Sequence, residues 1–183
     1  KNTGCTINGV CGKKEDTANY QDLLIFACQG LAFATIEARK KGIDTNVESK
    51  HITNGLFITI TNANFDNAAI MKAINDCIAL RDNLKTKASI NEKNDALDWK
   101  GTTEADFNEK AKQVSTLFFD KDEDIRALKQ YTLFGIKGIA AYAEHAFNLG
   151  FEEQDIYNFM EETLVMIARP MNLKDMLDWL VKT

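Results

Sequence analysis

The sequence predicts an all-α protein built from two consecutive three-helix bundle units that are related by an internal repeat, the second of them truncated. Three observations support this class. Apolar residues recur at spacings of three and four along most of the chain, as in amphipathic helices. The 183 residues include a single proline, so few helices are interrupted from within. A long segment with a central glycine occurs twice, which indicates a duplicated unit.

The first unit is expected in residues 17–87. Thr17 is a good N-cap residue, and apolar residues at helical spacing follow it as far as Gly42, a typical helix-ending residue. Residues 44–65 include LFITIT, a β-branched run that suits a strand, but no second such run exists to pair with it, so we predict a helix. Asp66 is expected to cap a third helix. Its apolar stripe comprises Ile70, Ile74, Cys77, Ile78 and Leu84.

The second unit is expected in residues 103–183, after a segment with little periodicity. That segment, residues 88–102, is polar apart from Leu97 and Trp99 and is predicted to be a linker. Helical periodicity then resumes in TEADFNEKAKQVSTLFF, EDIRALKQYTLFGIKGIAAYAEHAFNLG, EEQDIYNFMEETLVMIAR and LKDMLDWLVKT. The last of these is shorter than its counterpart in the first unit, so we expect the second unit to be cut within its final helix.

The repeat aligns LIFACQGLAFATIEARKKGI with TLFGIKGIAAYAEHAFNLGF without a gap. The paired residues, each 108 positions apart, are Phe26 with Phe134, Gly30 with Gly138 and Gly42 with Gly150. Each copy is predicted to be a long helix that ends at its second glycine. The glycine in the middle has no side chain, so we expect another helix to approach closely there.

Charge and composition exclude several classes of protein. The net charge of -5, with basic and acidic residues interspersed, argues against a nucleic-acid partner. No apolar run approaches the length of a membrane span, and no charged-then-apolar leader precedes the first helix, so no membrane partner is expected. The 4 cysteines are too few for a disulfide scaffold in a chain of 183 residues. We therefore expect a cytoplasmic protein.

Two cysteines, Cys5 and Cys11, lie in the glycine-rich stretch KNTGCTINGVCGKKE before the first helix. Two thiolates cannot complete a tetrahedral site, so the pair is either half of a metal centre or incidental to a turn. Small neighbouring residues leave room for an iron–sulfur cluster, and zinc is also compatible with two thiolates. Cys28 and Cys77 lie on apolar stripes and are expected to pack in the core.

Other candidate motifs favour structural roles. Glu48 and His51 form an E-x-x-H pair, but a di-iron bundle needs two such pairs, and Tyr142 stands three positions before the only other histidine, His145. Glu144 and His145 are adjacent in the sequence, so they point in different directions around a helix. Phosphate-binding loops and nucleophile motifs are absent from the sequence, and no catalytic residue is assigned.

Several segments resemble a known family. KNTGCTINGVCGK, TANYQDLLIFACQGLA, ITNANFD, GIKGIAAYAEHAFNLGF and MNLKDMLDWLVK resemble the N-terminal region of the hydroxylamine reductases, the hybrid-cluster or prismane proteins. The resemblance runs from Lys1 to about Lys182 and is weakest across residues 88–112. It implies that Cys5 and Cys11 are the third and fourth ligands of a [4Fe-4S] cluster, or of a [2Fe-2S] cluster as in some members. Residues 1–16 are then part of an iron–sulfur loop whose first two cysteines lie upstream in a C-x2-C motif.

The resemblance also implies an activity that needs more than this chain. The family reduces hydroxylamine with two electrons and two protons to ammonia and water, and nitric oxide reduction is also attributed to it. Its hybrid iron–sulfur–oxygen cluster is held by two further domains, so this chain is expected to hold no intact cluster and to be inactive alone. Expected partners are those C-terminal domains, a redox protein as electron donor, and a second copy in a homodimer. The alternative is a stand-alone helical protein-interaction module.

Overall fold

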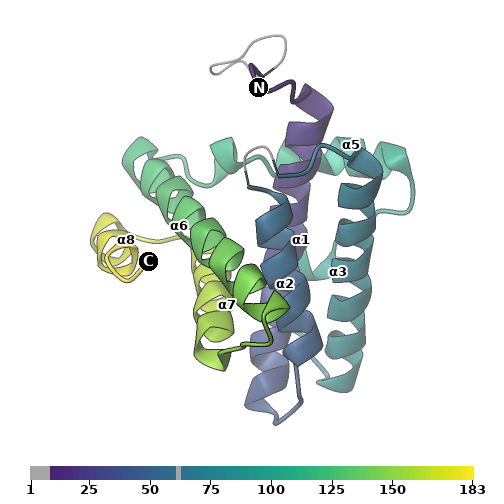
Figure 1. The fold of residues 1–183 in the computed structure, drawn as a ribbon, viewed down its shortest axis with the longest axis vertical. Helices are drawn as coiled ribbons and strands as arrows, with labels where there is room; N and C mark the ends of the chain where they lie inside the picture. The colour runs from purple at the N-terminus through teal and green to yellow at the C-terminus, as the bar shows by residue number, and fades with distance from the viewer. Residues whose placement is uncertain (1–8, 61–62) are drawn as a thin grey trace.

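The computed structural model describes residues 9–60 and 63–183, and within them every regular element is a helix (Figure 1). This confirms the all-α prediction. The helix expected in residues 44–65 covers Asn46–Ile58, so the first three residues of LFITIT are helical. In chain order the elements are α1 (Glu15–Lys40), α2 (Asn46–Ile58), α3 (Asn67–Lys87), α4 (Asp95–Asp98), α5 (Glu104–Gln113), the 3-10 helix η1 (Thr116–Phe118), α6 (Glu123–Asn148), α7 (Gln154–Ala168) and α8 (Leu173–Leu180).

Local signals account for most of the helix ends. Asp66 caps α3 as predicted, because its Oδ1 accepts the amide hydrogens of Ala68 at 2.9 Å and Ala69 at 3.2 Å. Gly42 and Gly150 follow α1 and α6 with φ of 73° and 85°, the left-handed conformation that glycine adopts readily. The prediction that Thr17 begins α1 is wrong. The helix starts at Glu15, where two acidic residues in the first turn complement the helix dipole.

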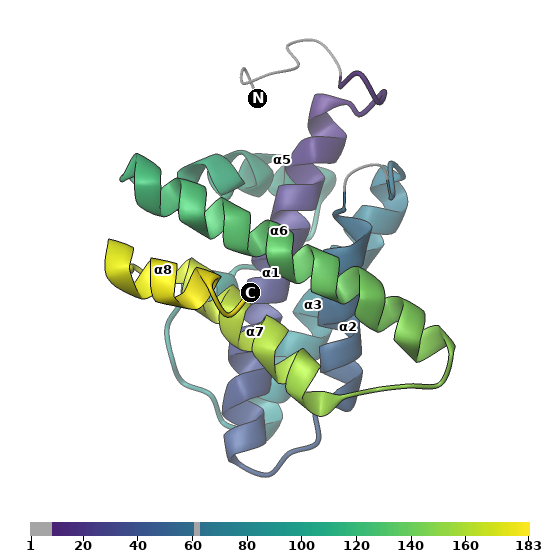
Figure 2. The same ribbon diagram turned by 60° about the vertical axis from the view of Figure 1, so that its left-hand side comes forward.

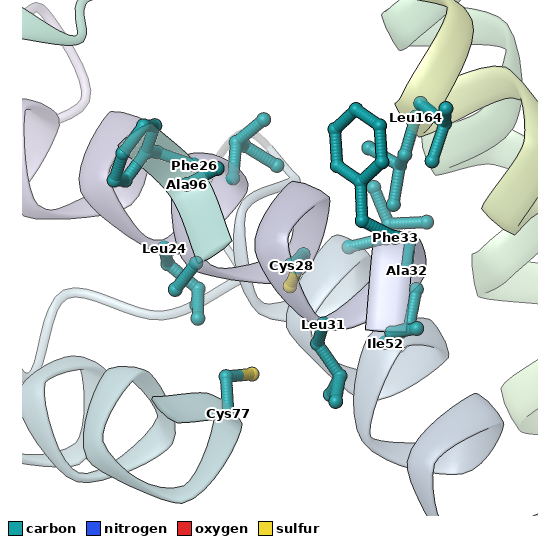
Figure 3. Packing of buried hydrophobic residues seen from close by; sticks show 14 of the residues in the cluster. Leu24, Phe26, Cys28, Leu31, Ala32, Phe33, Ile52, Cys77, Ala96 and Leu164 are labelled. Atoms are coloured by element: carbon teal, nitrogen blue, oxygen red, sulfur yellow. The ribbon is translucent and has the colours of Figure 1, made fainter. Parts of the chain in front are cut away.

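The core is organised around α1, which packs against α2, α3, α4, α5 and α7. Nearly every residue from Leu23 to Ala34 is buried, whichever face of the helix it occupies. Figure 3 shows this packing, in which Ile52 of α2 and Leu164 of α7 lie around the α1 residues Leu31 and Phe33. A helix that is apolar on all faces is stable in water only at the centre of a bundle, and α1 occupies that position.

The helix bounds follow the predicted offset of 108 residues. The range of α6 is that of α1 displaced by 108, and α7 begins 108 residues after α2. The helices are nevertheless not separated into two bundles, because α7 packs against α1 and α2, and α6 packs against α2 (Figure 2). The division into units at residues 17–87 and 103–183 therefore stays a prediction.

The segment 88–102, predicted to be a linker, packs on the core. It contains α4, whose Ala96 and Leu97 are buried, and the ring of Trp99 meets Phe26 edge-on with centroids 6.2 Å apart. The backbone of α4 lies directly on Gly30, where an added Cβ would be 2.8 Å from the carbonyl carbon of Ala96. The close approach predicted at the mid-helix glycine is therefore confirmed at Gly30.

The same prediction is wrong for Gly138. Among the described residues, nothing lies within 4 Å of a Cβ added at this position, and Gly138 is exposed. The two glycines differ because α4 covers α1, whereas nothing in the described chain covers the corresponding part of α6.

In the part of the chain that the structure describes, no helix has the length and hydropathy needed to cross a bilayer.

Candidate functional site

Cys11 lies at the tip of a tight loop that precedes α1. The amide of Gly9 donates to the carbonyl oxygen of Lys13 at 2.9 Å, and Gly12, with φ of 88°, donates to Gly9 at 2.8 Å. A Cβ added at Gly9 would lie 2.9 Å from Cys11 Sγ, so the glycine gives the thiol its space. Cys11 is exposed. Cys5, the other predicted ligand, lies outside the described residues.

The loop is held against the start of α1 by the side chain of Lys13. Lys13 Nζ donates to Gln21 Oε1 at 2.9 Å and lies 5.5 Å from the ring centroid of Phe65. Gln21 Nε2 in turn donates to the carbonyl oxygen of Asn64 at 2.9 Å. The segment ITNANFD, which the resemblance includes, thus contributes the residues that support the base of the cysteine loop.

A cavity of about 300 Å³ lies beside this loop, between α1 and α6. Lys13 and Gln21 line it from the loop side, and Gln130 and Lys137 line it from α6. Lys137 Nζ also donates to the carbonyl oxygen of Thr59 at 3.2 Å, so it connects α6 to the end of α2. The rest of the lining includes the acidic Asp22 and the apolar Leu133 and Phe134, so the cavity is mixed in character.

The described residues supply one thiol for a cluster and do not form a complete site. Within residues 9–60 and 63–183, no three His, Cys, Asp or Glu side chains lie together in a way that could hold a metal ion. An iron–sulfur cluster of the expected type has four cysteine ligands. We therefore assign no chemical step to a cluster on the described residues.

Cys28 and Cys77 are core residues, as predicted. Both are buried, and they come from α1 and α3, which pack together (Figure 3). A hydrogen bond with Cys77, together with burial, raises the pKa of the Cys28 thiol well above its usual value. α2 also approaches closely here, because a Cβ added at Gly55 would lie 2.5 Å from Cys28 Sγ. Neutral buried thiols of this kind pack as small hydrophobic groups.

The two histidines make local contacts. His51 Nδ1 is 3.1 Å from the carbonyl oxygen of Val47, one turn earlier in α2. The ring of His145 meets Phe57 edge-on, with centroids 6.2 Å apart. Both contacts agree with the structural roles expected for these residues.

An ionic cluster centred on the buried side chain of Glu161 joins three helices. Glu161 of α7 accepts hydrogen bonds of 2.6 Å from Ser49 Oγ of α2 and 2.6 Å from Arg39 Nη2 of α1. Burial raises the pKa of Glu161, and the hydrogen bonds from Ser49 and Arg39 only partly oppose this effect. The three residues of the cluster, Arg39, Ser49 and Glu161, form no sequence motif. Only the packing of α7 on α1 and α2 brings them together.

Glu161 is expected to make stability fall as pH rises above 4.5, its ordinary pKa. A raised pKa means that the folded protein holds the proton more tightly than the unfolded chain. Glu161 therefore makes a stabilising contribution to the free energy of unfolding that is full below pH 4.5 and disappears as pH rises through the raised pKa. Urea unfolding of the wild type and of Glu161→Gln across this range measures the effect. The difference between them should decline by at most about 1.4 kcal/mol per pH unit, the limit for one proton.

Carboxylates with lowered pKa values do not interfere in that range. Amide hydrogen bonds from Thr102 and Thr103 lower the pKa of Asp106 to about 2, so its contribution is lost only as pH falls below its ordinary value of 3.8. A constant difference between the wild type and Glu161→Gln from pH 4.5 upward would contradict the assignment of a raised pKa to Glu161.

By themselves, the fold and the cysteine loop define an all-helical domain with an exposed thiol at its N-terminal end. The model of the Prismane/CO dehydrogenase family matches residues 1–183, so the chain belongs to this family. It is 42% identical over 180 residues to a hydroxylamine reductase of Clostridium novyi (strain NT), covering 95% of this chain and 33% of the relative.

Two further relatives have the same name and a similar coverage. A hydroxylamine reductase of Clostridium perfringens (strain 13 / Type A) is 46% identical over 171 residues, covering 90% of this chain and 31% of the relative. A hydroxylamine reductase of Bacteroides thetaiotaomicron is 45% identical over 167 residues, covering 91% of this chain and 30% of the relative. The chain thus spans about a third of the length of the curated relatives it matches.

Proposed function

We propose that this chain is the N-terminal electron-relay domain of an iron–sulfur oxidoreductase that reduces hydroxylamine to ammonia and water. The reaction consumes two electrons and two protons for each hydroxylamine. The observation that carries the proposal is the family match across residues 1–183, supported by relatives that are named hydroxylamine reductase. Nitric oxide is a second candidate substrate for the same enzyme.

In this proposal Cys5 and Cys11 are the last two of four cysteine ligands, the first two being upstream. The group they help to hold is a [4Fe-4S] cluster, or a [2Fe-2S] cluster, which accepts and passes on single electrons. The exposed position of Cys11 beside Gly9 suits a bulky group, and Lys13 keeps the loop against α1. The hybrid iron–sulfur–oxygen cluster belongs to further domains, a cytoplasmic redox protein donates the electrons, and the chain alone is inactive.

The proposal includes the domain organisation of the chain. Residues 1–16 form the cysteine loop, residues 17–87 and 103–183 are duplicated helical units, and residues 88–102 connect them. The equal displacement of α6 from α1 and of α7 from α2 supports a duplication. The shorter α8, in the place of α3, is consistent with a second unit that is incomplete.

Cys11→Ala in the full-length protein is expected to abolish the relay cluster, because one of its four thiolate ligands is lost. Iron and acid-labile sulfide per chain, measured after anaerobic purification, should fall by the content of one cluster. The 183-residue chain, incubated anaerobically with iron and sulfide, should not retain a stable cluster.

Cys77→Ala is the matched control, because it removes a thiol that is buried between α1 and α3. Its iron and sulfide content should equal that of the wild type. Loss of iron in both variants, or in neither, would reject the assignment of Cys11 as a ligand. A stoichiometric, stable cluster on the 183-residue chain would show that the proposed upstream ligands are not needed.

A helical protein-interaction module remains the second candidate, and exposed aromatic residues on α6 favour it. The two candidate functions predict different sequences upstream of Lys1. A gene that encodes no C-x2-C motif there would exclude the relay cluster and leave the interaction module.

A further inference from the structure

One face of α6 exposes a stripe of uncharged residues, which we call the α6 outer stripe. Its members are Tyr131, Phe134, Gly138 and Tyr142 of α6, and Leu149, the residue directly after the helix. Their spacing of three, four, four and seven residues places them on one side of the helix. The exposed fractions of Tyr131, Phe134 and Tyr142 are 68%, 64% and 82%. Large aromatic side chains gathered on one face in this way typically mark a contact surface.

The corresponding face of α1 shows what such a stripe binds. Displaced by 108 residues, the first four positions of the α6 outer stripe become Leu23, Phe26, Gly30 and Ala34, and all four are buried. The segment after α3 covers this face. Its Ala96 backbone lies on Gly30, and its Trp99 ring meets Phe26 edge-on at 6.2 Å.

Further contacts hold this covering segment in place on α1. Arg81 of α3 is buried and donates hydrogen bonds to the carbonyl oxygens of Ala96 at 2.7 Å and Trp99 at 2.9 Å. Lys110 Nζ lies 4.8 Å from the ring centroid of Phe26. The covering segment therefore consists of the short helix α4, held by Arg81 of α3, and of Trp99, whose ring lies beside Phe26.

On the α6 side, α8 is the helix that corresponds to α3 in the repeat. It begins at Leu173, close to the position that corresponds to the start of α3, and it packs on α6. The chain after α8 reaches Gly135 of α6, where an added Cβ would lie 3.5 Å from Cβ of Thr183. In Figure 2, α6 lies at the front of the molecule with α8 beside it and no helix drawn over it.

We propose that the α6 outer stripe binds the polypeptide that follows residue 183 in the full-length protein. The bound segment lies with its backbone on Gly138 and with an apolar side chain beside Phe134, as α4 and Trp99 lie on Gly30 and Phe26. Relatives about three times as long as this chain supply the length that this requires. The inference rests on the proposed function only in assigning the chain to a longer protein.

Tyrosine modification tests the proposal in the full-length protein and in the 183-residue chain. Tetranitromethane should nitrate Tyr131 and Tyr142 in the 183-residue chain and should modify each at least tenfold more slowly in the full-length protein. Tyr20 and Tyr157 are buried and serve as unreactive controls in both. Equal reactivity of Tyr131 and Tyr142 in the two proteins would overturn the proposal.

A substitution in the stripe gives a second, independent test. Gly138→Leu should leave the melting temperature of the 183-residue chain unchanged or raise it, because the added side chain meets open space. In the full-length protein it should lower the melting temperature of this domain. Ala79→Leu, at an exposed position of α3, is the matched control and should leave the melting temperature of both proteins nearly unchanged.

The outcomes separate this proposal from the proposed function. If the full-length protein reduces hydroxylamine while Tyr131 and Tyr142 stay reactive, only the docking proposal fails. If both tyrosines are protected in a full-length protein that lacks the activity, the docking proposal stands and the proposed function fails. Protection in the 183-residue chain that increases with its concentration would assign the stripe to a second copy and overturn the proposal.

Discussion

Gly30→Ala is expected to lower the free energy of unfolding of this chain by about 3 kcal/mol. The added Cβ would overlap the carbonyl group of Ala96, and a backbone atom cannot move away by changing a rotamer. Relieving the overlap requires α4 to move off α1, which also disturbs the packing of Trp99 on Phe26. The helix propensity of alanine recovers only about 1 kcal/mol. Urea unfolding followed by circular dichroism measures the change.

Gly138→Ala is the matched control and is expected to change stability in the opposite direction. Gly138 occupies the same place in α6 as Gly30 does in α1, but no described residue lies near its added Cβ. Only helix propensity then acts, and it should raise the free energy of unfolding by about 1 kcal/mol. Equal effects of the two substitutions would show that α4 does not lie on Gly30 as described.

Arg81→Met is expected to cost about 3 kcal/mol, because it leaves buried hydrogen-bond acceptors without a donor. Arg81 is 1% exposed and donates to the carbonyl oxygens of Ala96 and Trp99. Methionine retains much of the side-chain volume, so the loss reports mainly on the hydrogen bonds and the charge. The expected result is a lower midpoint of urea unfolding with little change in its slope.

Lys100→Met provides the comparison for Arg81, since both cations pair with Asp82. Burial would raise the pKa of Asp82, but hydrogen bonds from Lys100 and Arg81 lower it overall. The side chain of Lys100 is 61% exposed, so its ion pair is screened by water, and its loss should cost less than about 1 kcal/mol. If Lys100→Met were as destabilising as Arg81→Met, the ion pair with Asp82 rather than the buried carbonyls would explain both effects.

Much of the helical structure could be predicted because its causes are local. Apolar spacing identified the long helices, including α2, which ends within the β-branched run LFITIT at Ile58. Asp66 and Gly42 marked helix ends through their own side-chain and backbone chemistry. Thr17 misled the prediction, because Glu15 and Asp16 before it already suit the first turn of a helix.

The candidate site was only partly predictable. The sequence located Cys11 in a glycine-bearing loop and assigned Cys28 and Cys77 to the core, and the structure agrees on both points. The role of Cys5 and Cys11 as ligands stays a proposal. The cluster of Arg39, Ser49 and Glu161 could not be predicted, since its members come from three helices and neither their types nor their spacing distinguish them from surface residues.

The sequence alone thus determined the helical class, several helix ends and the correspondence between α1 and α6. These follow from interactions between residues a few positions apart and from direct comparison of two segments. Only the tertiary structure decided which glycine is covered. Gly30 lies beneath α4 and Gly138 is open, although the two helices align without a gap and have the same length. The difference arises from a segment more than sixty residues away from Gly30, and periodicity within a helix contains no information about a contact over that distance.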